Sequence, residues 1–223
     1  MVSPSDVCII LTATIFVNLD KVGLVQKNAE ERRKIYMKRT MQWLENTKFK
    51  IVLVENSGAN MNELSNALEI YKDRFEIVSY CERDLEDAKY LKNDRSKGCS
   101  ELFAIQHSYK VSSFAKESQI ICKVTARYFI PDLENYLSEQ NLDKYVALAQ
   151  HDPNRCELVG CNKEGFNEVF YQYALDKDGN RQGHVEHVYK FRMTRLGDKV
   201  FRFPEFQIEP TLRGGVDGMY SII

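Results

Sequence analysis

The run Ile120-Ile121-Cys122-Lys123-Val124-Thr125-Ala126-Arg127-Tyr128 has the pattern of a β-strand that ends in a hydroxyl group and a cation. Two earlier runs have the same form, Cys8-Ile9-Ile10-Leu11-Thr12-Ala13-Thr14 and Ile51-Val52-Leu53-Val54-Glu55-Asn56-Ser57-Gly58. In an open α/β sheet, ligands bind just beyond the carboxyl ends of the strands. The three runs therefore predict hydrogen-bonding groups and a cation at one edge of a sheet, an edge that suits a phosphate-bearing nucleotide.

Strand-like and helix-like segments alternate along the first 125 residues. Strands are predicted at 7–14, 50–54, 75–80 and 119–125, and helices at 29–46, 64–71 and 98–110;. Asn60-Met61-Asn62-Glu63 has the form of a capping box before the second helix. A further strand is predicted at 145–150, with helices over 166–173 and 184–195. This order favours an α/β fold with a parallel or mostly parallel sheet.

Composition limits the function classes. The chain has 223 residues, enough for one α/β domain, with 43% hydrophobic and 28% charged residues, which argues against disorder;. The net charge of −1 lacks the basic excess of a nucleic-acid binder;. No run approaches the roughly 20 apolar residues that span a bilayer. The six cysteines form no Cys-x-x-Cys pair, which favours reduced thiols over disulfides or zinc;. We expect a soluble, cytoplasmic protein.

Two common nucleotide-binding motifs are missing. The first predicted strand is followed by Thr12-Ala13-Thr14-Ile15, without the glycines that let a backbone approach a pyrophosphate;. The late cluster Gly214-Gly215-x-x-Gly218 leaves too little chain for a following helix, and no Walker motif occurs. The sequence therefore argues against NAD-dependent and P-loop chemistry.

Three segments carry candidate ligand-binding groups, and each has an ordinary structural alternative. Glu55-Asn56-Ser57-Gly58 offers a carboxylate and an amide to a nucleobase and a ribose, or it is a simple turn;. Ser96-Lys97-Gly98-Cys99-Ser100-Glu101 opens a helix that favours an anion, or Ser96 is an ordinary cap;. The guanidinium of Arg127 suits a phosphate, or it closes a buried ion pair.

Later segments carry candidates for a base and for metal ligands. In His151-Asp152-Pro153-Asn154-Arg155, Asp152 is a candidate general base or metal ligand, or it starts a turn;. His184-x-x-His187, with Glu186 between the two histidines, has a workable spacing for a metal or forms a polar helix face.

Together these segments resemble small nucleotide-sugar glycosyltransferases of the GT-A fold, encoded by large algal viruses and by surface-polysaccharide gene clusters. Within this family, the chain resembles the N-terminal glycosyltransferase domain of a chlorella-virus multidomain protein. The matching pieces, in chain order, are Leu11-Thr12-Ala13-Thr14-Ile15, Val54-Glu55-Asn56-Ser57-Gly58, Lys97-Gly98-x-x-Glu101, Lys123-Val124-Thr125-Ala126-Arg127-Tyr128, Asp152-x-x-Arg155, Val185-Glu186-His187-Val188-Tyr189 and the glycine-rich tail Arg213–Gly218. Each piece is short, so their order across nearly the whole chain carries the resemblance.

The resemblance implies a site for a nucleotide-sugar donor. The implied donor-binding residues are Thr12, Ala13, Thr14, Glu55, Asn56, Ser57, Lys97, Glu101, Thr125 and Arg127. Asp152 is the first candidate for the acceptor-side base, and Glu186 is the second. Most GT-A enzymes hold Mn²⁺ with an Asp-x-Asp, whereas this chain has Thr125-Ala126-Arg127 at the corresponding place. Arg127 is expected to do part of the metal's work, and Mn²⁺ or Mg²⁺ remains a possible cofactor on Asp152, His184 and His187.

We therefore expect one GT-A-like domain over 1–223, a Rossmann-type three-layer sandwich with a mostly parallel sheet between helices. A nucleotide-binding half covers about 1–130 and an acceptor-side half about 131–223. The expected activity is transfer of a hexose or deoxyhexose from a nucleotide sugar, UDP-linked by preference, to an oligosaccharide or glycoprotein glycan. A viral member would act in the host cytoplasm, and further domains of a longer polypeptide are possible partners. The alternatives are a non-catalytic nucleotide- or carbohydrate-binding domain and a nucleotidyltransferase.

Overall fold

The first half of the chain alternates strands and helices as predicted. The computed structural model describes residues 1–21, 24–176, 178–214 and 218–223. Its elements up to Thr125 are η1 (Pro4–Asp6), β1 (Val7–Ala13), α1 (Ala29–Asn46), β2 (Lys50–Glu55), η2 (Asn62–Leu64), α2 (Ser65–Ile70), β3 (Phe75–Ser79), η3 (Glu82–Asp84), η4 (Glu86–Leu91), α3 (Lys97–Val111), α4 (Ser113–Glu117) and β4 (Ile120–Thr125).

The second half contains more strands than the sequence pattern predicted. It comprises α5 (Leu133–Ser138), β5 (Ala147–Ala149), β6 (Leu158–Asn162), α6 (Phe166–Val169), α7 (Val185–Leu196), η5 (Gly197–Lys199), β7 (Val200–Arg202), β8 (Gln207–Leu212) and β9 (Met219–Ile222). Helix α5 and strands β6 to β9 were not predicted. The helix predicted over 166–173 ends at Val169, four residues early.

One seven-stranded sheet, in the order β3-β2-β1-β4-β6-β5-β7, forms the centre of the molecule. Strands β3, β2, β1 and β4 are parallel. Strand β6 runs antiparallel to both β4 and β5, and β7 is parallel to β5. Only β6 is therefore reversed among the described strands of this sheet, which confirms the prediction of a mostly parallel sheet.

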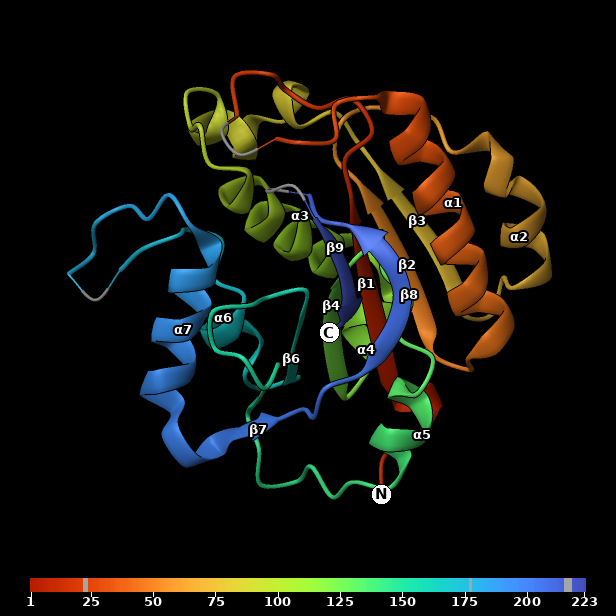
Figure 1. The fold of residues 1–223 in the computed structure, drawn as a ribbon, viewed down its shortest axis with the longest axis vertical. Coiled ribbons are helices and arrows are strands. Elements are labelled where there is room, and N and C mark those ends of the chain that lie inside the picture. Colours follow the sequence, from red (N-terminus) through yellow and green to blue (C-terminus); the bar gives the residue numbers. More distant parts are fainter. Residues whose placement is uncertain (22–23, 177, 215–217) are drawn as a thin grey trace.

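The alternating side chains of the strands build two cores, one on each face of the sheet. Ile9 and Leu11 of β1 pack with Trp43 of α1 in the first core, which also holds residues of α2, α5, β8 and the C-terminus. Cys8 and Ile10 face the other way and pack with α3, α4, α6 and α7. Figure 1 shows α1 and α2 together on one side and the β8–β9 hairpin crossing in front of β1 and β4. The result is the expected three-layer sandwich.

Some local expectations need correction. Asn60 was predicted to cap the second helix, but the helix begins with the turn η2 and no side chain caps either element. The side chain of Glu63 pairs with Arg33 at 3.1 Å instead. All six cysteines are free in the structure. Among the described residues, no helix has the length and apolar character needed to cross a membrane.

Candidate active site

A cleft of about 1070 Å³ lies at the carboxyl ends of β1, β2 and β4. Its walls also include the first turns of α3 and α7 and parts of the segments 154–157 and 213–220. Of the ten predicted donor-binding residues, all but Glu55 line it: Thr12, Ala13, Thr14, Asn56, Ser57, Lys97, Glu101, Thr125 and Arg127. The structure therefore brings together side chains that lie up to 115 residues apart in the sequence.

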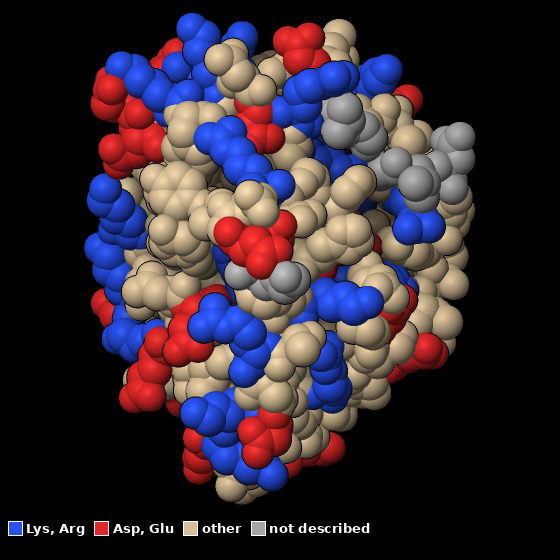
Figure 2. Space-filling model, turned by 90° about the vertical axis from the view of Figure 1, so that its left-hand side faces the viewer, with Lys and Arg blue, Asp and Glu red and all other residues tan. Residues whose placement is uncertain are grey.

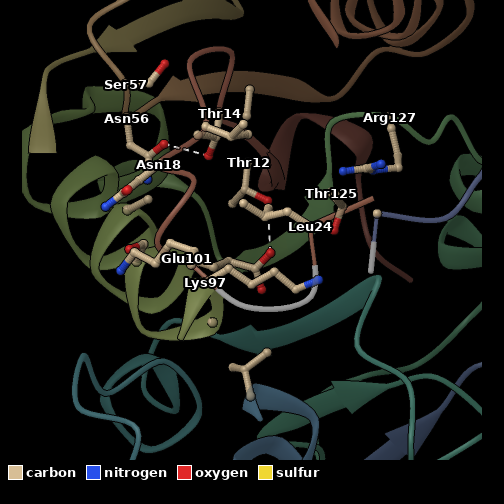
Figure 3. A pocket seen from close by; sticks show the side chains of 18 of the residues that line it. Thr12, Thr14, Asn18, Leu24, Asn56, Ser57, Lys97, Glu101, Thr125 and Arg127 are labelled. Atoms are coloured by element: carbon tan, nitrogen blue, oxygen red, sulfur yellow. Dashed lines mark hydrogen bonds between the residues drawn. The ribbon is translucent and has the colours of Figure 1, made fainter. Parts of the chain in front are cut away.

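Uncharged hydrogen-bonding groups and one carboxylate form one end of the cleft. Thr14 Oγ1 donates to Asn56 Oδ1 at 2.7 Å, an interaction drawn in Figure 3. Asn56 Nδ2 donates in turn to Glu82 Oε2 at 3.3 Å, and Ser100 Oγ donates to Glu82 Oε1 at 2.9 Å. Burial raises the pKa of Glu82, while the hydrogen bonds from Ser100 and Asn56 oppose that rise. Sequence reasoning missed Glu82, because nothing local connects it with the ends of β1 and β2.

Glu55 is not a wall of the cleft, although it was predicted to bind the donor. Its side chain is fully buried and accepts hydrogen bonds from the backbone N–H groups of Ile15 (3.0 Å), Ser57 (3.1 Å) and Ala59 (2.9 Å). The carboxylate thus folds back onto its own turn and ties that turn to the end of β1. Glu55 therefore holds the backbone of the turn that carries Asn56 and Ser57, which line the cleft.

The N-termini of α3 and α7 meet beside the cleft. Ser96 caps α3, since its Oγ accepts from the backbone N–H groups of Gly98 (3.2 Å) and Cys99 (3.4 Å). A Cβ on Gly98 would lie 2.4 Å from Cβ of Val185, so only glycine allows this approach of α7. His184 gives α7 no side-chain cap. Both positive helix ends therefore border the cleft and favour an anionic ligand there.

Two buried arginines line the cleft, Arg127 just after β4 and Arg32 in α1. Arg127 is 6% exposed, and its Nη1 donates to Gln26 Oε1 at 2.8 Å. No carboxylate pairs with Arg127 in the part of the chain that the structure describes. Arg32 donates to the backbone oxygens of Thr14 (2.6 Å) and Gln26 (3.1 Å). Burial lowers the pKa of Arg32, and the charge of Arg127 lowers it further. These two like charges suit an anion, and the alternative of a structural ion pair for Arg127 finds no partner among the described residues.

Lys97 reaches across the cleft from the first turn of α3. Figure 3 shows its side chain extending toward Thr125 at the end of β4, on the side where Arg127 also points inward. Burial lowers the pKa of Lys97; Glu186 raises it and Arg127 lowers it. The ammonium group is therefore electrostatically coupled to both the cation of β4 and the carboxylate of α7.

A buried ion pair forms part of the cleft wall. Lys123, in the middle of β4, is 1% exposed, and its Nζ lies 2.8 Å from Glu101 Oε1. Thr12 Oγ1 donates to Glu101 Oε2 at 3.3 Å. The sequence pattern alone predicted no role for Lys123. The available signal was a lysine inside an otherwise apolar strand, since lysine is almost never fully buried without a partner.

Comparisons with known proteins agree on the architecture. Neither a family model nor a curated protein sequence matches the chain. Among solved structures, an active-site mutant of the galactosyltransferase LgtC superposes with a TM-score of 0.54 at 8% identity, over 87% of this chain and 72% of LgtC. The glycosyltransferase GlyE of Streptococcus pneumoniae superposes with a TM-score of 0.51 at 10% identity, over 88% of this chain and 44% of GlyE.

The fold is that of the GT-A glycosyltransferases. A further structure, a glycosyltransferase involved in glycosylation of the major capsid of PBCV-1, matches 88% of this chain and 81% of its own, with 11% identity and a TM-score of 0.46. The superpositions with TM-scores of 0.54 and 0.51 confirm the predicted fold class.

Within this GT-A fold, Asp152 does not line the cleft. Its Oδ1 accepts from the backbone N–H (2.8 Å) and Nδ2 (3.1 Å) of Asn154, in the manner of a turn-starting aspartate;. The reason lies in the sheet order, because the reversed strand β6 separates β5 from β4. Two strand spacings place the end of β5 roughly 10 Å from that of β4. Glu186, the second candidate, does line the cleft.

Two of the candidate metal ligands, His184 and His187, lie at the start of α7. His184 lines the cleft, and its ring centroid lies 5.6 Å from that of His187. No group of three His, Cys, Asp or Glu side chains suited to a metal occurs among the described residues. A requirement for Mn²⁺ or Mg²⁺ stays a prediction. Residues 215–217 of the glycine-rich tail lie outside the described residues.

Positive charge exceeds negative charge in the cleft. Its described walls carry eight Lys or Arg residues against five Asp or Glu residues: Lys21, Arg32, Arg83, Lys92, Lys97, Lys123, Arg127 and Arg213 against Asp20, Glu82, Glu101, Glu157 and Glu186. The whole chain has a net charge of −1. Figure 2, viewed from the side of α7, shows both signs interspersed over that face. The positive excess therefore belongs to the cleft and favours an anionic ligand.

Proposed function

We propose that the protein is a glycosyltransferase that moves a sugar from a nucleotide diphosphate sugar, UDP-linked by preference, to a hydroxyl group of a glycan. The observation that carries the proposal is the buried guanidinium of Arg127, which lines the cleft without a carboxylate partner in the described residues. A diphosphate supplies the missing negative charge and accepts two parallel N–H bonds from a guanidinium.

The proposed donor lies along the carboxyl ends of β1, β2 and β4. Thr14, Asn56 and Ser57 bind the nucleoside at the end of the cleft that is rich in hydrogen-bonding groups. Arg127 and Lys97 hold the diphosphate at the other end. When the bond between the sugar and the diphosphate breaks, negative charge grows on the departing phosphate oxygen. Fixed cations at that place stabilise the transition state more than the ground state.

Glu186 is the proposed acceptor-side base. It lies in the first turn of α7, lines the cleft and interacts with Lys97. Its carboxylate accepts the proton of the acceptor hydroxyl, whose oxygen bonds to the anomeric carbon as the nucleoside diphosphate leaves. A base in this position contributes typically about 10²–10⁴ in rate. We prefer Glu186 to Asp152 for this role because Asp152 does not line the cleft.

Thermal shift with nucleotide sugars tests the donor site. UDP-, GDP-, dTDP- and CMP-sugars are each added with and without Mn²⁺, and the melting temperature is measured. A ligand at a hundredfold excess over its Kd stabilises the native state by about 2.7 kcal/mol. We expect a clear shift with a diphosphate-linked sugar. If none of these ligands at millimolar concentration raises the melting temperature, the proposal is wrong.

Product analysis then separates the proposal from its alternatives. A glycosyltransferase releases the nucleoside diphosphate when it transfers the sugar or hydrolyses the donor slowly. A binding domain would retain intact donor, and a nucleotidyltransferase would release pyrophosphate from a nucleoside triphosphate and a sugar phosphate. Chromatography of the nucleotide products distinguishes the three outcomes.

A further inference from the structure

The ion pair between Lys123 and Glu101 is unusual in its position. Lys123 lies in β4, between β1 and β6 at the centre of the sheet, and its side chain is 1% exposed. Besides the carboxylate of Glu101, its Nζ bonds the backbone oxygen of Cys156 at 2.8 Å. A buried lysine is costly unless it is paired, and apolar residues of similar volume often serve stability equally well. Stability alone therefore does not explain why this strand carries a lysine.

The environment keeps the lysine ionised. Burial is the largest single effect and lowers the pKa of Lys123, but the charge and hydrogen bond of Glu101, together with Cys156 and Glu157, outweigh it, so that the pKa is raised overall. A charged ammonium at this place holds Glu101 Oε1 by both charge and a short separation. The ammonium group of Lys123 therefore fixes the orientation of the Glu101 carboxylate.

Glu101 retains hydrogen-bonding capacity toward the cleft. Its Oε1 faces Lys123 and its Oε2 accepts from Thr12. Oε1 is buried against Lys123. An acceptor oxygen of a carboxylate has about two positions, so Oε2 keeps one beside the bond from Thr12;. The side chain is 19% exposed and lines the cleft. Figure 3 shows Glu101 beside Lys97, both reaching from α3 toward the ends of β1 and β4. An ionised carboxylate only accepts hydrogen bonds, and a sugar hydroxyl donates them.

We propose that Glu101 accepts a hydrogen bond from one hydroxyl of the transferred sugar and that Lys123 is the positioning residue that fixes its carboxylate. The inference rests on the proposed function, since it assumes a nucleotide sugar in the cleft. The inference adds a specificity determinant, because the sugar must place a hydroxyl group within hydrogen-bond distance of the Glu101 carboxylate. Sites built to bond a hydroxyl discriminate strongly against analogues that lack it.

Deoxyfluoro analogues of the bound nucleotide sugar test this inference, because fluorine replaces a hydroxyl without donating a hydrogen bond. Calorimetry gives the ratio of Kd for each analogue to Kd for the parent sugar, with UDP or the matching diphosphate as reference. In the wild-type protein we expect one analogue to bind about tenfold more weakly or worse, as the loss of a bond to a charged group implies. In Lys123→Met, the Kd ratio of that same analogue should fall close to one, while the Kd of the bare diphosphate is unchanged.

Three variants complete the experiment. Glu101→Gln should reduce the ratio, because it removes the charge and keeps the shape. The double variant Lys123→Met with Glu101→Leu removes both charges, so it should melt at a higher temperature than Lys123→Met alone. Its Kd ratio for the affected analogue should stay close to one, because no carboxylate remains to accept the hydrogen bond. Tyr189→Phe is the matched control, since Tyr189 is buried near Glu101 and its hydroxyl has no hydrogen-bond partner in the described residues. It should keep the wild-type ratio.

The outcomes separate this inference from the proposed function. A wild-type protein that binds no nucleotide diphosphate or nucleotide sugar contradicts the proposed function itself. Donor binding with equal affinity for every deoxyfluoro analogue overturns only the role of Glu101. If Lys123→Met weakens the diphosphate, the parent sugar and all analogues by the same factor, Lys123 is merely structural. If Lys123→Met does not fold, the Glu101→Gln ratio and the double variant decide, and a wild-type ratio in either overturns the inference.

Discussion

Gly214 lies directly against the guanidinium of Arg127. A Cβ placed on Gly214 would come within 2.6 Å of Nη2 and 2.9 Å of Cζ of Arg127. The backbone oxygen of Gly214 also accepts from the backbone N–H of Val25 at 3.4 Å, one residue before Gln26, which bonds the same guanidinium. Gly214 therefore packs against Arg127, and a change at Gly214 is expected to affect the position of the guanidinium.

Gly214→Ala should weaken binding of a nucleoside diphosphate with little loss of stability. The added methyl group meets the far end of a flexible side chain, so we expect Arg127 to move and the backbone to stay. Gly183→Ala is the control, because a Cβ there meets nothing within 4 Å although Gly183 also lines the cleft. Calorimetry with UDP on both variants checks this. Equal UDP affinity in Gly214→Ala and wild type would show that Arg127 does not hold the phosphates.

Arg127→Lys should weaken diphosphate binding even though the charge is kept. Lysine supplies a point charge, whereas the planar guanidinium can make two parallel bonds to a phosphate. We expect a larger loss of affinity for UDP than for UMP, and the smallest loss for uridine. Equal fold losses for all three ligands would contradict the phosphate role.

Arg192→Lys is the structural control for that experiment. Arg192 is 8% exposed and donates to the backbone oxygens of Val169, Tyr171 and Tyr173 at 2.8–2.9 Å. Its replacement should lower the melting temperature without a preference among the three ligands. The comparison separates loss of a buried arginine in general from loss of the one in the cleft.

Glu186→Gln should lower turnover by about 10²–10⁴ and leave donor binding intact, since the amide keeps the shape but accepts no proton. Asp152→Asn should retain nearly wild-type turnover, because Asp152 does not line the cleft and its Oδ1 accepts hydrogen bonds from Asn154. Rates of transfer or of donor hydrolysis measure both. A large loss of turnover in Asp152→Asn with little loss in Glu186→Gln would show that Asp152 is the base.

The ion pair of Glu209 should make stability depend on pH in the acid range. The hydrogen bond from Arg39, at 2.5 Å, and that from Lys38 lower the pKa of Glu209 from its ordinary value of 4.5 to about 2. The folded state therefore binds a proton less readily than the unfolded state. The stabilisation is complete above about pH 4.5 and is lost as the pH falls toward 2. Urea unfolding of wild type and Glu209→Gln should differ at pH 7 and converge near pH 2.

The strand ends were predictable because their signal is local. A buried strand needs a continuous apolar run, and the polar residues that end it fall at the ligand-binding edge of a parallel sheet. Thr12, Asn56 and Thr125, which line the cleft, were predicted in this way, and their role in donor binding stays a prediction. The same logic failed for Asp152, although it also follows a strand, because the reversal of β6 moves that strand end away from β4. Strand order is a nonlocal property that no window of sequence reveals.

The sequence by itself determined the alternation of strands and helices, the mostly parallel sheet and the edge at which its polar residues gather. Only the tertiary structure decided which of those polar groups are already engaged and which face the cleft. Glu55 turns back onto its own backbone, Lys123 meets Glu101, and Arg127 meets Gln26 from 101 residues away. Hydrogen bonds and ion pairs depend on separations of about 3 Å, and only the folded chain sets those distances.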